Sequence, residues 1–294
     1  MANLKLIRIR IASVKSTRQI TSAMKMVSAA KLRKAQDKIL RLRPYARKLH
    51  EILVGLSQNL AESEVENIYG RTTVPEKILL VIITSNRGLC GAFNSNVIKE
   101  TKRIVSDIYP EQFSQGNVTL LPVGKKGYDY FRKLNYRMLP DCNHLLNDLT
   151  FNNVVVVAES IMNRFVSGEY DRVEIIYNQF KNAAVQNLTD ETFLPVESVQ
   201  QGKPESAPAD YIYEPTKEEI IKELIPKSLK IQFYKAVLDS FVAEHGARMT
   251  AMHKATDNAT EMIRDLTLQY NKARQAAITN QILEVVSGAE ALKG

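Results

Sequence analysis

Hydrophobic residues recur every three or four positions at both ends of the chain. In the first arm they are Leu4, Ile7, Ile11, Val14, Ala35, Ile39, Leu42, Ala46, Leu49, Leu53, Leu56 and Leu60. In the last arm the same spacing runs through Met252, Thr256, Ala259, Ile263, Leu266, Tyr270, Ala273 and Ala277. This is the spacing of a coiled-coil seam. Because the two seams are of one type and an inserted domain separates them, we expect the arms to pair as an antiparallel two-helix coiled coil.

The first seam changes character over one stretch. There its positions hold polar residues: Arg18, Thr21, Lys25 and Ser28. The apolar residues Ile20, Met24 and Val27 lie one position aside. This arrangement predicts that the apolar stripe drifts around the helix in this stretch.

Proline and glycine separate the arms from the middle of the chain, because both are disfavoured inside helices. Residues 70–226 hold nine of the ten prolines and eight of the twelve glycines. We therefore predict four segments: an N-terminal coiled-coil helix (1–69), a central α/β domain (70–197), a linker and helix start (198–226), and a C-terminal coiled-coil helix (227–294).

The central segment alternates between strand and helix patterns. Strands are predicted at Lys77 to Ser85, Val118 to Val123 and Arg172 to Phe180, and helices at Asn94 to Tyr109 and Lys125 to Leu134. The four valines 154–157 favour a strand by propensity, but their continuation through Ala158, Ile161, Met162 and Phe165 has helical spacing, and we favour a helix. The alternation predicts a Rossmann-like α/β domain.

Charge and composition narrow the function. Residues 1–50 carry +13 and the rest of the chain −5, which together give the net charge of +8. The basic arm suits nucleic acid or an acidic protein partner, and we favour the protein, since the arm lacks interleaved aromatic residues. Neither the two cysteines nor the four histidines have metal-ligand spacing. No apolar run is long enough to span a membrane.

A nucleotide site in such a domain would follow the first predicted strand, where α/β sheets often bind phosphate. Neither phosphate-loop pattern is present. The segment 86–94 (Asn-Arg-Gly-Leu-Cys-Gly-Ala-Phe-Asn) has two glycines, which we interpret as a tight strand-to-helix turn. Cys90 within it is expected to be a small buried residue rather than a reactive thiol. We therefore predict no catalytic site, cofactor or metal.

Three stretches of the C-terminal arm are more specific. They are 244–252 (Glu-His-Gly-Ala-Arg-Met-Thr-Ala-Met), 255–259 (Ala-Thr-Asp-Asn-Ala) and 270–279 (Tyr-Asn-Lys-Ala-Arg-Gln-Ala-Ala-Ile-Thr). Together with the opening motifs at 11–17 and 20–27 and the Arg-Gly-Leu-Cys-Gly at 87–91, they resemble the gamma subunits of F-type ATP synthases. The sequence departs from the usual family pattern at Gln281 and Ala92, which removes any expected charge contact at Gln281.

The resemblance implies a non-catalytic rotor subunit in the central stalk of a rotary motor. One copy would stand inside a ring of three alpha and three beta subunits, and its foot would bind epsilon and the c-subunit ring. Ion flow would turn it, and the rotation would drive ATP synthesis, or run in reverse during hydrolysis. The chain would be a peripheral membrane protein at the cytoplasmic face of a bacterial inner membrane.

The resemblance also assigns contact residues. Those expected at the beta-subunit loops are Met24, Lys25, Arg248, Arg274, Gln275 and Thr279. Those expected at the c ring and epsilon are Tyr211, Tyr213 and Glu214. By pattern alone, Met24 would only pack the seam and Arg274 would only be solvated. A free-standing coiled-coil scaffold is the alternative function.

Overall fold

The computed structural model describes residues 2–58, 68–70, 74–196 and 217–291. Its contacts form two units, residues 1–29 with 248–294 and residues 30–247. The long helices α1 (Ala2–Gln58) and α6 (Lys217–Ala291) contribute to both units. Tyr211, Tyr213 and Glu214 lie outside the described residues.

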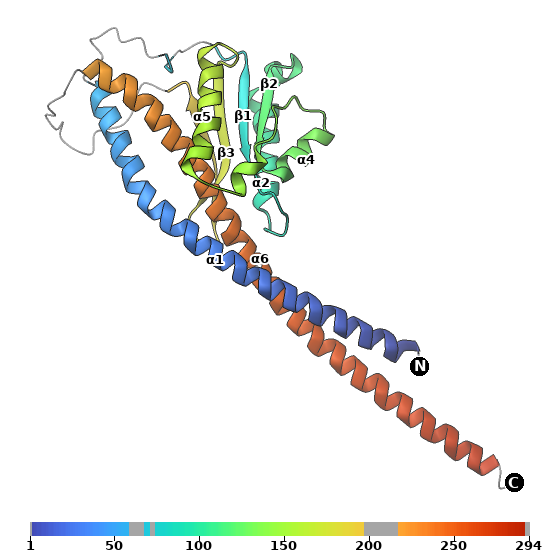
Figure 1. The fold of residues 1–294 in the computed structure, drawn as a ribbon. Coiled ribbons are helices and arrows are strands. Elements are labelled where there is room, and N and C mark those ends of the chain that lie inside the picture. The colour runs from blue at the N-terminus through green and yellow to red at the C-terminus, as the bar shows by residue number, and fades with distance from the viewer. Residues whose placement is uncertain (1, 59–67, 71–73, 197–216, 292–294) are drawn as a thin grey trace. The chain divides into compact units, whose positions relative to one another are not determined.

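The first unit is an antiparallel pair of helices (Figure 1). Arg8 Nη2 donates to Tyr270 Oη at 2.7 Å, and the hydroxyls of Thr21 and Thr256 lie 2.8 Å apart. As the residue number rises along α1, the partner's number falls along α6. The predicted antiparallel coiled coil is therefore confirmed.

The seam of α1 keeps its register through the polar stretch. Thr21 is 8% exposed and Ser28 is 2% exposed, whereas Ile20 and Val27 are both 57% exposed. The predicted drift of the apolar stripe is therefore wrong. The reason is that small hydroxyl residues tolerate burial when their oxygens are bonded, and Thr21 Oγ1 donates to the carbonyl of Arg18 at 3.1 Å.

The second unit holds a four-stranded sheet in the order β2-β1-β3-β4. Its strands are β1 (Ile78–Ile83), β2 (Val118–Val123), β3 (Arg172–Phe180) and β4 (Gln186–Leu194). β1 pairs in parallel with β2 and β3, and β4 is antiparallel to β3. All six residues of β1 are buried, as expected of a central parallel strand covered on both faces. The three predicted strands are confirmed, and β4 was not predicted.

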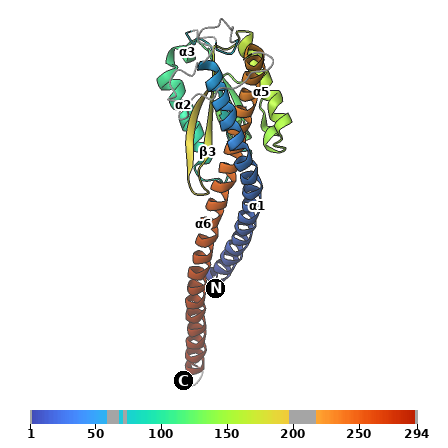
Figure 2. The ribbon, with the colours of Figure 1, turned by 90° about the vertical axis from the view of Figure 1, so that its left-hand side faces the viewer.

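Helices cover the sheet on both sides. They are α2 (Phe93–Arg103), which continues as a π-helix (Ile104–Ile108), α3 (Pro110–Ser114), α4 (Lys125–Lys133), a 3₁₀ turn (Asn143–Leu146) and α5 (Phe151–Val166). Figure 2 shows α2 and α5 on opposite sides of β3. The valine run belongs to α5, with Val154 buried and Val156 66% exposed, so the helical interpretation is confirmed.

In this unit α6 packs between α5 and β4. The rings of Phe233 and Phe193 (β4) lie 5.7 Å apart, and Tyr234 meets Phe151 (α5) edge-on at 5.4 Å. Lys230 Nζ forms an ion pair with Glu159 (α5) at 2.6 Å. The α/β domain is thus fixed onto the helix that continues into the coiled coil.

Candidate partner interface

The seam of α6 determines which of its side chains face outward. Ala273 and Ala277 occupy seam positions and are partly buried, whereas Arg274, Gln275 and Thr279 are exposed. Gln275 and Thr279 are four residues apart and lie on one face, with Arg274 beside them. This polar face offers a guanidinium, an amide and a hydroxyl, which suit carboxylates and carbonyls of a partner.

Beyond this polar face, α6 presents apolar side chains to solvent. Every residue from Ile278 to Ala291 is exposed. Leu283 is 58% exposed and Val285 is 71% exposed. Contiguous exposed apolar surface of this kind marks an interaction site. The end of α6 is therefore a second part of the candidate interface.

A third part lies on α1, in the first unit. Met24 and Lys25 are both partly buried, and Lys25 Nζ lies 3.3 Å from His253 Nδ1. The most exposed apolar side chain of this stretch is Met26, at 65%. The motif match did not select Met26, although the seam register at Thr21 and Ser28 would have placed it outward.

A shallow groove of about 430 Å³ accompanies this stretch of α1. Its lining residues come from both helices of the first unit: Arg18, Gln19, Ser22, Ala23, Met26, Thr256 and Thr260. The groove combines a cation, an amide and hydroxyls with apolar surface. It is suited to hold a loop of another protein.

Arg248 differs from the other predicted contact residues. It is 7% exposed and interacts with other groups of this chain. Sequence motifs indicate that an arginine is present but not whether its side chain is buried. A contact through Arg248 therefore requires a partner to reach the small part of the side chain that remains accessible.

The start of α4, which follows β2, is already bonded to the segment after β1. At the start of α4 the backbone N–H groups of Lys125, Lys126 and Gly127 donate to Asn86 Oδ1, the Ser85 carbonyl and Thr84 Oγ1, at 3.1, 3.1 and 2.9 Å. N–H groups at a helix start are the ones that bind phosphate in nucleotide sites. Here they are bonded to residues 84–86, which follow β1. The predicted strand-to-helix turn at 86–94 is observed, with Gly91 at a φ of +60° and Phe93 N donating to the Cys90 carbonyl at 3.3 Å.

The cysteines have no feature of a reactive pair. Cys90 is 1% exposed, and Asn94 Nδ2 lies 3.2 Å from its sulfur, so the expectation of a small buried residue is confirmed. Burial, with a smaller effect of Asp141, raises the pKa of Cys142 to about 11. A thiol with a raised pKa holds little of the reactive thiolate at neutral pH.

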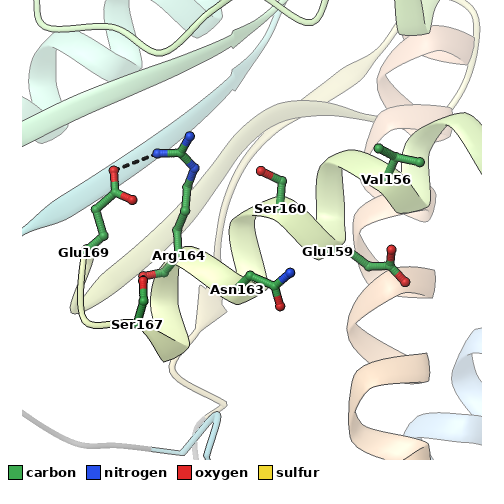
Figure 3. Close-up of a pocket in the computed structure, with 7 residues that line it drawn as sticks. All are labelled: Val156, Glu159, Ser160, Asn163, Arg164, Ser167 and Glu169. Carbon is green, nitrogen blue, oxygen red and sulfur yellow. Dashed lines mark hydrogen bonds and ion pairs between the residues drawn. The ribbon is translucent and has the colours of Figure 1, made fainter.

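A hollow of about 630 Å³ on the outer face of α5 is lined by Val156, Glu159, Ser160, Asn163, Arg164, Ser167 and Glu169 (Figure 3). Its charged groups are already paired. Arg164 Nη1 lies 2.7 Å from Glu169 Oε1, and Glu159 pairs with Lys230.

Among the described residues, no three His, Cys, Asp or Glu side chains gather as a metal site. Within the same residues, no helix has the length and apolar character needed to cross a bilayer.

Comparisons with known proteins point to one family. The sequence model of the ATP synthase family matches residues 3–292. The chain is 58% identical to the ATP synthase gamma chain of Flavobacterium johnsoniae over 100% of both chains. It is 49% identical to the ATP synthase gamma chain of Cytophaga hutchinsonii, over 99% of each.

Solved structures agree with this result. A chain of the central stalk and c ring of the Tetrahymena thermophila mitochondrial ATP synthase is 27% identical, with a TM-score of 0.57, over 80% of this chain and 99% of that one. A chain of the Euglena gracilis mitochondrial OSCP/F1/c-ring structure is 21% identical, with a TM-score of 0.67, over 99% of this chain and 95% of that one. At that identity the second similarity supports the fold alone.

Proposed function

The chain belongs to the ATP synthase gamma chain family and is a non-catalytic rotor subunit of the central stalk, and we propose that it passes torque to the beta subunits through the exposed face of α6 at Arg274, Gln275 and Thr279. The subunit works with the alpha and beta subunits, epsilon and the c ring. The comparisons do not support the alternative of a free-standing scaffold.

The observation that carries the proposal is the unequal surface of the coiled coil. The exposed face of α6 is polar at Arg274 and Gln275, whereas α1 exposes the apolar Ile20, Met26 and Val27. A two-helix cross-section has no threefold symmetry. At any angle it therefore presents a different surface to each of three equivalent sites, which favours a different conformation at each. Rotation then exchanges these conformations in turn.

The other predicted contacts form part of the same proposal. Lys25 places an ammonium group at 3.3 Å from His253 Nδ1 of α6, where it can attract an acidic segment of beta. Met24 is proposed to pack against that segment. Arg248 is assigned to the beta loops by its motif position, although its burial separates it from the face at Arg274. Tyr211, Tyr213 and Glu214 are assigned in the same way to the c ring and epsilon.

The exposed apolar end of α6 supports an enclosed position inside the ring. Side chains such as Ile282 and Val286, 57% and 53% exposed in this chain, would lie against apolar surface and make no lasting ion pairs. Rotation would then break no strong bonds. We further propose that the complex holds the subunit at the cytoplasmic face of a bacterial inner membrane.

The test replaces Arg274, Gln275 and Thr279 together by alanine in the assembled enzyme. We expect ATP synthesis driven by an ion gradient to fall at least tenfold, which corresponds to about 1.4 kcal/mol and is the scale of one lost hydrogen bond to a charged group. The matched control replaces Gln269 and Asn280, which are also exposed but lie on a different side of α6. Unchanged synthesis in the first variant, or an equal loss in the control, would refute the role of this face.

A further inference from the structure

Arg43 joins three elements of the second unit. Its Nη2 donates to Asp239 Oδ1 on α6 at 2.9 Å and to the carbonyl of Phe180, the last residue of β3, at 3.0 Å. One guanidinium nitrogen carries two hydrogens, so both bonds can form at once. Arg43 itself lies on α1, and the helix α1 is thereby bonded to α6 and to the sheet.

The carboxylate that Arg43 meets is deeply buried. Asp239 is 0% exposed, and its Oδ2 has no hydrogen-bond partner among the described residues. Burial raises the pKa of Asp239, while the hydrogen bond and charge of Arg43 act in the opposite direction. A buried carboxylate without a counter-charge is strongly destabilising. The Arg43 side chain is 41% exposed. It stays at this position because moving away would leave the buried carboxylate of Asp239 without a counter-charge.

The part of α6 that carries Asp239 is itself attached to the sheet. Gln232 Nε2 donates to Glu191 Oε1 of β4 at 2.7 Å, and Tyr177 of β3 donates to the other oxygen of Glu191 at 3.0 Å. Asp239 thus belongs to a frame formed by α6, β3 and β4. The bonds of Arg43 connect α1 to that frame.

We propose that Arg43 is a positioning residue that locks α1 to the α/β domain, so that both helices turn with the domain when torque is transmitted. The inference rests on the rotor function. The same helix α1 continues into the first unit, where it forms one strand of the coiled coil. If α1 could slide on the domain, part of each rotation would be absorbed by that movement rather than transmitted to the beta subunits.

The test compares Arg43→Met with Arg41→Met in the assembled enzyme in membrane vesicles. Arg41 is an exposed arginine of the same helix. Two rates are measured, ATP hydrolysis and ATP-driven ion pumping, and their ratio is the readout. We expect Arg43→Met to hydrolyse ATP while pumping fewer ions per ATP, and Arg41→Met to keep the ratio of the unmodified enzyme. Loss of stability or assembly alone would lower both rates together and leave the ratio unchanged.

Two further variants keep the result interpretable. Arg43→Lys retains the charge and is expected to restore most of the ratio. The double variant Arg43→Met with Asp239→Leu removes the charge and the carboxylate together, so no unpaired buried charge prevents folding. If Arg43→Met does not assemble, the double variant carries the test, and we expect it to assemble with a low ratio.

The proposal is overturned if the assembled Arg43→Met variant, or the assembled double variant, pumps as many ions per ATP as the unmodified enzyme. It is also overturned if Arg41→Met lowers the ratio equally. Failure of the rotor function itself would look different. In that case ion pumping by the unmodified enzyme would not depend on the presence of this subunit.

Discussion

Gly124, which precedes α4, has a conformation that only glycine adopts easily. Its φ is +118°, and a Cβ added to it would lie 2.1 Å from the carbonyl oxygen of Thr84 and 2.8 Å from Thr84 Oγ1. Both contacts are far below van der Waals separation. Relieving them would push β1 and β2 apart where Thr84 N donates to the Val123 carbonyl at 2.8 Å, and it would disturb the bond from Gly127 N to Thr84 Oγ1.

We therefore expect Gly124→Ala to destabilise the α/β domain by about 3 kcal/mol. The strained backbone contributes about 1–3 kcal/mol, and the disturbed hydrogen bond contributes about 1 kcal/mol. The overlap with Thr84 adds to both. The reduced entropy of the unfolded chain offsets only about 0.4–1 kcal/mol of this cost.

Gly91→Ala is the matched control. Gly91 also has a positive φ, +60°, but an added Cβ would meet nothing within 4 Å. Only the left-handed backbone costs energy there, about 1–2 kcal/mol before the same offset. Urea unfolding of the full chain, followed by near-ultraviolet circular dichroism of its tyrosines, measures both variants. If Gly124→Ala is no less stable than Gly91→Ala, steric overlap does not explain the glycine at this position.

Two other predictions follow from charge and from burial. Partial burial, together with the charges of Glu174 and Glu100, raises the pKa of Asp190 to about 6 from 3.8. The folded state then binds the extra proton between these pH values, so this group lowers stability as pH rises. Asp190→Asn should raise the stability at pH 7 by less than about 1 kcal/mol, because the carboxylate is only partly desolvated and solvent screens its charge. A gain in stability that persists below pH 4 would contradict this origin. In the coiled coil, Leu266 is 6% exposed, and Leu266→Ala should lower the free energy of unfolding in urea by about 2 kcal/mol. Leu268 is 54% exposed and provides the control: Leu268→Ala should cost below about 0.5 kcal/mol. Equal losses would mean that the seam is misassigned.

Most of the central domain could be predicted because its strands are apolar runs in a buried sheet. β4 could not, since Gln186–Leu194 is largely polar and its first residues are exposed or partly buried. An edge strand needs few apolar residues, and its pairing with β3 depends on a partner that local pattern does not reveal. The polar residues at the seam of α1 were also misleading, because a polar side chain can be buried when its hydrogen bonds are satisfied. Thr21 and Thr256 are accepted there because their hydroxyl oxygens have partners: they lie 2.8 Å apart, and the carbonyls of Arg18 and Met252 can accept from them.

The exposure of three of the candidate contact residues was predictable from the register of the seam. Once Ala273 and Ala277 are assigned to the seam, Arg274, Gln275 and Thr279 must face outward. Burial of Arg248 was not predictable, because it depends on tertiary contacts that an arginine in a motif does not specify. The role of Arg43 was missed for the same reason: its acceptors, Asp239 and the Phe180 carbonyl, are far away in the sequence.

The end of α6 runs on past Tyr270, the residue that meets Arg8 of α1. A solitary helix of a few turns is only marginally stable in water, and ordering each residue costs about 1–2 kcal/mol of backbone entropy. In the enclosed position proposed above, the tip of α6 would draw its rigidity from the surfaces around it. Because part of the binding free energy is used to order the helix, the tip binds its surroundings more weakly than its apolar area alone would give. A weaker interaction suits a helix end that has to stay in place and still rotate.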